Sequence, residues 1–72
     1  MDPKERFRNT LAMLIKASGK PKQQIAKEIG MVPAVISDYL SGRNSPSIYV
    51  LPRLCQSLDC TYEDLLGPVG QD

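Results

Sequence analysis

The sequence predicts an all-α protein, a compact bundle of five short helices. Apolar residues recur at helical spacing on both sides of Gly30, at Ile25 and Ile29 before it and at Ile36 and Leu40 after it. Prolines stand where helices are expected to begin, and glycines stand where they are expected to end. Seventy-two residues suffice for one small domain of this kind.

The first helix is expected to begin beside Asp2 and to end at Gly19. Asp2 at the N-cap, Pro3 at the first helical position and Glu5 three residues after the cap form a combined start signal. Helical spacing gives this segment an inward face of four apolar residues: Phe7, Leu11, Leu14 and Ile15.

The second helix is expected from near Pro21 to Gly30, and the third from Pro33 to Gly42. Gly30 allows the positive φ of a tight turn, and Ala26 is small enough for another helix to cross close above it. Two short helices joined by such a turn form a helix-turn-helix. Neither start has a polar capping residue, which costs roughly 1 kcal/mol each. Five apolar residues are expected to hold the two helices together: Ile25, Ile29, Met31, Ile36 and Tyr39.

The fourth helix must have Pro52 in its first turn, because proline has no N–H and its ring strikes the carbonyl four residues earlier. It therefore begins within residues 47–51, and Asp59 ends it in a left-handed conformation that acidic residues tolerate better than most. Its inward face is expected to carry Leu51, Leu54, Cys55 and Leu58.

The fifth helix is short and is expected to be capped by Thr61 and Asp64, with Leu65 and Leu66 completing the core. We expect the domain to cover residues 1–67. Residues 68–72 are expected to form a flexible tail or the start of a linker, and a longer natural protein with a dimerising domain is compatible with this end.

The residue inventory argues against an enzyme. A chain of 72 residues buries only about 60% of its extended surface, which leaves little core around a catalytic cleft. The sequence lacks histidine, the commonest general base, and its two cysteines alone do not form the four-ligand set of structural zinc. We therefore expect no catalysis, no metal and no cofactor, with Cys55 and Cys60 reduced.

Charge is distributed unevenly along the chain, although the net charge is only +1. Residues 1–53 contain all nine basic residues and four acidic ones, a net charge of +5, whereas residues 54–72 contain four acids and no base. This polarity favours a polyanionic partner for the first part of the chain. A randomly mixed, solvated surface is the alternative.

The chain resembles the helix-turn-helix family of lambdoid phage repressors and Cro. The resemblance lies in Ile25, Ala26, Ile29, Gly30, Ile36 and Tyr39, and it continues through residues 41–47, 51–58 and 62–67. It implies a sequence-specific regulator of transcription, in most cases a repressor, that binds double-stranded DNA in a bacterium or is encoded by a phage. No apolar run is long enough for a membrane span and the first residues do not form a signal peptide, so we expect a cytoplasmic protein.

The resemblance makes the helix over residues 33–41 the recognition helix that enters the major groove. The family's base-reading positions fall on its outward side, but no arginine, lysine, glutamine or asparagine stands there. We expect Ala34, with Val35 or Pro33, to pack on thymine methyl groups. Ser37 and Asp38 would hydrogen-bond to base edges, Asp38 accepting from cytosine N4. The predicted base-reading residues are Pro33, Ala34, Ser37, Asp38 and Ser41.

Phosphate contacts are expected from the start of the second helix and from the segment after the third, because unpaired N–H groups at a helix start favour an anion. The predicted residues are Lys20, Lys22, Gln23, Arg43 and Asn44. A structural role for Asp38, paired with Arg43 or Lys27, stays open, and each cation taken singly is as often merely solvated.

A domain of this size contacts a single half-site, so we expect a homodimer. Formation of the dimer only on DNA is one form of this expectation. The surface expected to pair is the region of the fourth and fifth helices with the tail. The alternative function is a protein-interaction module that keeps the fold but no longer reads DNA. The apolar residues 32–35 favour that alternative.

Overall fold

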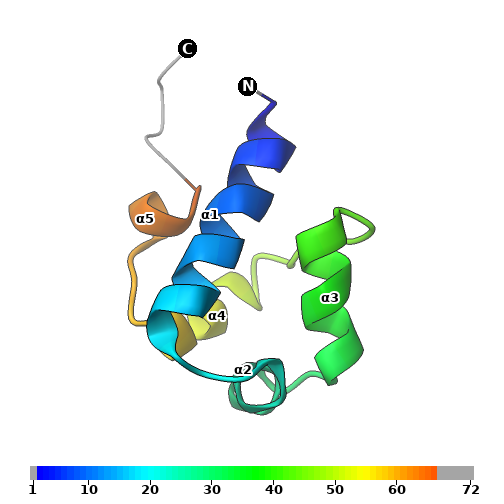
Figure 1. Ribbon diagram of the computed structural model, residues 1–72, viewed down its shortest axis with the longest axis vertical. Coiled ribbons are helices and arrows are strands. Elements are labelled where there is room, and N and C mark those ends of the chain that lie inside the picture. Colours follow the sequence, from blue (N-terminus) through cyan, green and yellow to red (C-terminus); the bar gives the residue numbers. More distant parts are fainter. Residues whose placement is uncertain (1, 67–72) are drawn as a thin grey trace.

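The computed structural model describes residues 2–66, which form five helices and no strand, as predicted for the fold class (Figure 1). Residues 67–72, and with them the predicted tail, lie outside the described residues. The helices are α1 (Pro3–Ser18), α2 (Lys22–Ile29), α3 (Pro33–Ser41), α4 (Leu51–Leu58) and α5 (Tyr62–Leu66). Among them, none is both long enough and apolar enough to cross a bilayer.

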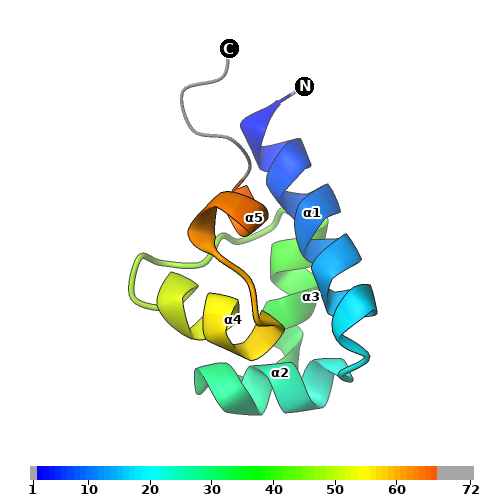
Figure 2. The ribbon, with the colours of Figure 1, turned by 90° about the vertical axis from the view of Figure 1, so that its left-hand side faces the viewer.

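One core receives side chains from all five helices. Six of its largest side chains are fully buried: Leu11, Ile25, Ile29, Ile36, Leu54 and Leu65. Around them α2 packs on α3 and α4, and α1 packs on α3 and α5 (Figure 2). Helix α3 consequently lies at the edge of the bundle with one side packed and the other side open (Figure 1).

Two residues expected in the core are more exposed than predicted. Leu66 is 42% exposed, so Leu65 alone of this pair completes the core. Adjacent residues in a helix point about 100° apart, and a five-residue helix presents one of them inward. Met31 is 38% exposed because it directly follows the turn at Gly30, and it contributes less to the α2–α3 contact than Ile29 or Ile36.

The predicted helix ends are confirmed. Gly30 has φ 75°, and the N–H of Met31 after it donates to the Ala26 carbonyl at 2.8 Å. Asp59 ends α4 at φ 54° and ψ 51°, the left-handed conformation expected from its position. Such a backbone disfavours most L-residues, and short acidic side chains are among the better tolerated.

All five helices begin where predicted. The caps of α2 and α3 are Pro21 and Val32, neither of which makes a side-chain cap hydrogen bond. In α5, the Thr61 hydroxyl accepts from the Asp64 N–H at 3.0 Å, and the Asp64 carboxylate accepts from the Thr61 N–H at 3.1 Å. Asp2 occupies the N-cap of α1, but its side chain does not cap the helix; Pro3 in the first turn sets the start instead.

Candidate nucleic-acid interface

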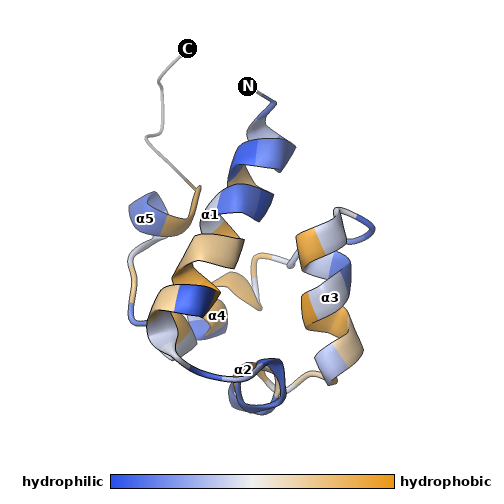
Figure 3. Cartoon of the chain, viewed as in Figure 1, coloured by the Kyte–Doolittle hydropathy of each residue, from blue (hydrophilic) through white to orange (hydrophobic). Residues whose placement is uncertain are grey.

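Helix α3 presents most of its predicted base-reading side chains to solvent. Pro33, Ala34, Ser37 and Ser41 are exposed, and Asp38 is half-buried. The opposite side is anchored by Ile36, which is fully buried, and by Tyr39, which is 2% exposed. The helix therefore combines a fixed inner side with an open outer side, and hydrophobic and polar residues alternate along it (Figure 3).

Val35 lies on the packed side of α3 rather than on its outward side. It is half-buried and contacts the core cluster. Pro33 and Ala34 are exposed at the start of the helix, so Val35 has a structural role in place of the one predicted.

Asp38 and Arg43 form a salt bridge at the end of α3. The Arg43 guanidinium lies 3.6 Å from the Asp38 carboxylate, and the Arg43 side chain is 80% exposed. Of the two partners predicted for a structural role of Asp38, the structure pairs it with Arg43; Lys27 forms no salt bridge within residues 2–66. The pair is long and its Arg43 partner is exposed, so it contributes little to stability and gives way readily to another partner.

The segment that follows α3 is held by backbone and hydroxyl contacts. The N–H groups of Arg43 and Asn44 both donate to the Asp38 carbonyl, at 3.0 and 3.3 Å. The Ser41 hydroxyl donates to the same carbonyl at 3.1 Å. The Asn44 side-chain oxygen accepts from the Ser45 N–H at 3.0 Å. These bonds set the positions from which Arg43 and Asn44 project into solvent.

The first turn of α2 presents Lys22 and Gln23 to solvent. Both are exposed, and neither side chain forms a salt bridge or hydrogen bond with another described residue. Their backbone N–H groups belong to the first turn, which has no carbonyl partner inside the helix. The Pro21 carbonyl accepts from the N–H groups of Gln24 and Ile25, at 3.1 and 3.2 Å. A cationic side chain beside unpaired N–H groups is suited to an anionic ligand.

A family profile described as helix-turn-helix matches residues 11–65 of the chain. The match spans every helix from the second half of α1 to α5, more than half of the 72 residues. The chain belongs to the helix-turn-helix family of lambdoid phage repressors and Cro. No curated protein and no solved structure matches it.

The family identifies this helix-turn-helix chain as a DNA-binding regulator. Helices α2 and α3, joined at Gly30, are the motif itself, and the second helix of such a motif is the one that enters the major groove. Within residues 2–66 no group of three or more histidine, cysteine, aspartate or glutamate residues is placed to hold a metal ion.

The Lys20 side chain faces α4 rather than an open surface. Its ammonium donates to the Glu28 carboxylate at 2.9 Å and to the Ser57 carbonyl of α4 at 2.6 Å. The Ser57 hydroxyl also donates to the Glu28 carboxylate, at 2.5 Å. We call Lys20, Glu28 and Ser57 the α2–α4 brace. The brace thus joins residues from three segments of the chain. The sequence pattern did not predict it, and the one signal that points to it is a serine, Ser57, on the inward side of α4.

The brace lowers the pKa of Glu28 from 4.5 to about 2. The hydrogen bond from Ser57 is the largest cause, followed by those from Lys20 and Gln24, because all of them favour the charged carboxylate. One residue further along α2, the Arg53 guanidinium donates to the Ile29 carbonyl at 3.5 Å. The C-terminal end of α2 is therefore tied to α4 by two neighbouring contacts.

The two cysteines are free thiols, as predicted. Burial raises the pKa of both, that of Cys60 to about 11, so both stay protonated at neutral pH. Cys55 is a small core residue, 7% exposed.

The brace predicts a specific dependence of stability on pH. The folded-state pKa of Glu28 lies below its ordinary value, so its contribution is present above about pH 4.5 and is lost as the pH falls toward 2. We expect Glu28→Gln to lower the free energy of unfolding at pH 7 and to flatten its decline between pH 4.5 and 2, measured by urea unfolding at a series of pH values.

Glu63→Gln is the matched control, because the Glu63 carboxylate forms no hydrogen bond or salt bridge with any residue among 2–66. If Glu28→Gln and Glu63→Gln show the same stability as the original chain at pH 7, the brace does not stabilise the fold.

Proposed function

We propose that this protein is a transcriptional repressor that reads a specific double-stranded DNA sequence by inserting α3 into the major groove. The observation that carries the proposal is the open outward side of α3, with Ala34 and Ser37 exposed on a helix whose other side is fixed by buried Ile36. An α-helix fits the major groove, where each base pair presents a distinct pattern of donors, acceptors and methyl groups.

Base recognition is proposed to combine one apolar and two polar contacts. The Ala34 methyl group, with Pro33 beside it, packs on thymine methyl groups, while Ser37 donates to or accepts from a base edge. Asp38 accepts from cytosine N4. The Asp38 salt bridge with Arg43 at 3.6 Å supports this arrangement, because DNA offers each partner a replacement: a cytosine amine for Asp38 and a phosphate for Arg43.

Phosphate contacts are proposed from two places that flank the outward side of α3. Lys22 and Gln23 contribute from the first turn of α2, and Arg43 and Asn44 contribute from the segment after α3. Lys20, which the sequence grouped with them, is proposed to act through the α2–α4 brace, because its ammonium already has two partners within 3 Å.

Two copies are proposed to bind one operator, each on a half-site, because a single domain of this size contacts too little DNA for useful affinity. Exposed Tyr62, 52% accessible, makes α5 the candidate for contact between the copies. We propose that the pair acts on DNA in the bacterial cytoplasm, as a chromosomal or phage-encoded regulator.

A second candidate function is a protein-interaction module that has lost groove reading. Val32 is 61% exposed, and Pro33 and Ala34 follow it on the surface, so the start of α3 is apolar and lacks side chains for bidentate base contacts.

Selection from a pool of random duplexes tests the proposed function. We expect enrichment of a near-palindrome whose half-site centres lie about 10 base pairs, or a multiple, apart. An absence of enrichment at low salt would contradict sequence-specific reading and favour the interaction module.

Asp38 should act as a discriminating residue. We expect Asp38→Ala to bind unrelated duplexes several-fold more tightly, because a negative charge near the phosphates is removed and Arg43 is released. Preference for the selected site over a variant at the cytosine should fall about 10-fold or more. Titration of both duplexes by fluorescence anisotropy measures the two effects, with Glu63→Ala as the control for loss of an acid. An equal loss of affinity for all sequences would contradict this role.

The proposed phosphate contacts predict the dependence of affinity on salt. Each of Lys22→Gln and Arg43→Gln should reduce the magnitude of the slope of log K against log salt by about 0.9. Lys20→Gln should leave the slope unchanged and lower stability instead. A reduction by Lys20→Gln that equals the one by Lys22→Gln would show that Lys20 leaves the brace to contact DNA.

A further inference from the structure

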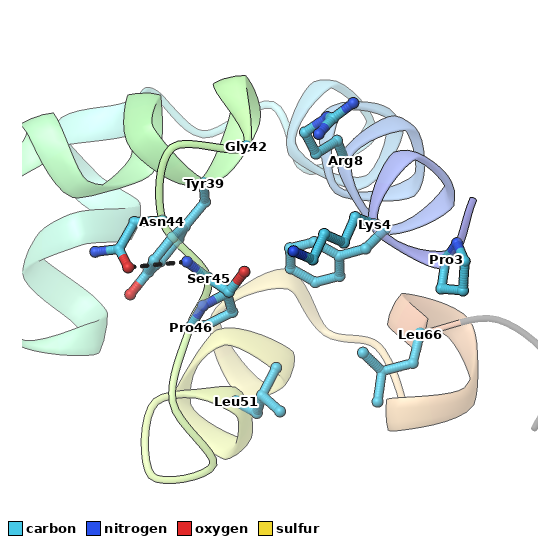
Figure 4. Close-up of a pocket in the computed structure, with 11 residues that line it drawn as sticks. Pro3, Lys4, Arg8, Tyr39, Gly42, Asn44, Ser45, Pro46, Leu51 and Leu66 are labelled. Atoms are coloured by element: carbon cyan, nitrogen blue, oxygen red, sulfur yellow. Dashed lines mark hydrogen bonds between the residues drawn. The ribbon is translucent and has the colours of Figure 1, made fainter.

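A cavity of about 230 Å³ opens between the start of α1, the segment after α3, the start of α4 and the end of α5 (Figure 4). Its apolar lining comes from four separate segments, with Phe7, Pro46, Leu51 and Leu66 as members. Leu66, the residue that does not enter the core, extends into this space (Figure 4). An apolar side chain that leaves the core to line a cavity gives an incoming apolar group a surface to cover.

Two cations border the cavity, and no acidic residue among residues 2–66 lines it. Lys4 and Arg8 lie one helical turn apart on α1, and neither side chain forms a salt bridge or hydrogen bond with another residue of the described part. The Arg8 guanidinium lies directly against Gly42, where an added Cβ would collide with it. One edge of the cavity is therefore positively charged and lacks a counter-ion from the described chain.

We propose that this cavity binds a small amphipathic monocarboxylate. The carboxylate would pair with Lys4 and Arg8, and the apolar body would cover Phe7, Leu51 and Leu66. Charge-assisted hydrogen bonds to an ammonium or guanidinium orient such a head group, while burial of the apolar body supplies the larger part of the affinity.

The size of the cavity limits the occupant. Most pockets for drug-sized ligands are larger than this one, so a ligand of roughly ten non-hydrogen atoms fits the space, with a dissociation constant on the order of 1 mM. A DNA phosphate would satisfy the two cations but would leave the apolar lining uncovered. A second copy of the chain would cover the lining but would be detected as self-association.

The test is a titration of the full chain, without DNA, followed through its amide NMR resonances, so that failure here is distinct from failure of the proposed function. Octanoate is the probe, and octylamine is the matched ligand with the opposite charge. We expect saturable shifts from octanoate at Phe7, Ser45 and Leu51, and at least about tenfold weaker binding of octylamine.

Lys4→Gln and the double variant Lys4→Gln with Arg8→Gln should weaken octanoate binding, the double variant by about tenfold. Lys16→Gln is the matched control, because this exposed cation lies in the last turn of the same helix and outside the cavity. Lys4 is exposed, so its variant reports on binding even where the double variant does not fold.

Three results from the ligand titrations would overturn the proposal. The first is the absence of saturable shifts at Phe7, Ser45 and Leu51 up to 10 mM octanoate, roughly ten times the expected dissociation constant. The second is an affinity for octylamine equal to that for octanoate. The third is a weakening of octanoate binding by Lys16→Gln equal to that by Lys4→Gln. Concentration-dependent shifts at the cavity in the absence of ligand would assign the cavity to a second copy and would also overturn it.

Discussion

The close contact of α2 with α3 is the constraint on which the proposed DNA-reading surface depends. Ala26 is fully buried on α2, and Ile25 and Ile29 of α2 and Ile36 of α3 are fully buried as well. A larger side chain at this crossing would force the helices apart, because protein interiors tolerate little extra volume. The turn at Gly30 sets the direction in which α3 leaves α2. Together these contacts determine which side of α3 faces solvent.

Helix α2 is itself positioned by polar contacts with α4. The brace of Lys20, Glu28 and Ser57 ties the segment before α2 and the last turn of α2 to α4, and Arg53 approaches the α2 terminus beside Gly30. These groups are partly exposed, so they contribute less to stability than to orientation. The chain therefore holds α3 through an apolar contact with α2, and it holds α2 through polar contacts with α4. The apolar and the polar contacts adjoin at Ile29 and Gly30.

The cavity beside Gly42 is lined in part by Asn44 and Ser45, which belong to the segment proposed to contact phosphates. An occupied cavity and bound DNA would therefore adjoin the same loop.

The fold was predictable from sequence because its decisive signals are local. Gly30 and Asp59 each end a helix through their own backbone conformation, and Thr61 and Asp64 cap α5 through bonds across three residues. Asp2 shows the limit of such signals. It occupies the N-cap position of α1, with Glu5 three residues later, but its side chain makes no capping hydrogen bond.

Features that depend on distant segments were not predictable in the same way. Lys20 appeared to be an available cation because its partners lie 8 and 37 residues further along the chain. Leu66 was predicted to lie in the core and is exposed, whereas Val35 was predicted as one candidate for a base contact and packs against the core. Helical spacing does not show how a short helix is rotated against its neighbours. The exposed positions of Ala34 and Ser37, by contrast, follow from the single rotation that buries Ile36 and Tyr39.

The most direct measurement of whether α3 enters the major groove is the set of intermolecular nuclear Overhauser effects between this protein and a bound duplex. We expect contacts from the Ala34 methyl group to a thymine methyl group, with Ser37 near an adjacent base edge in the major groove. Contacts confined to sugar protons, to the minor groove or to helices other than α3 would contradict it.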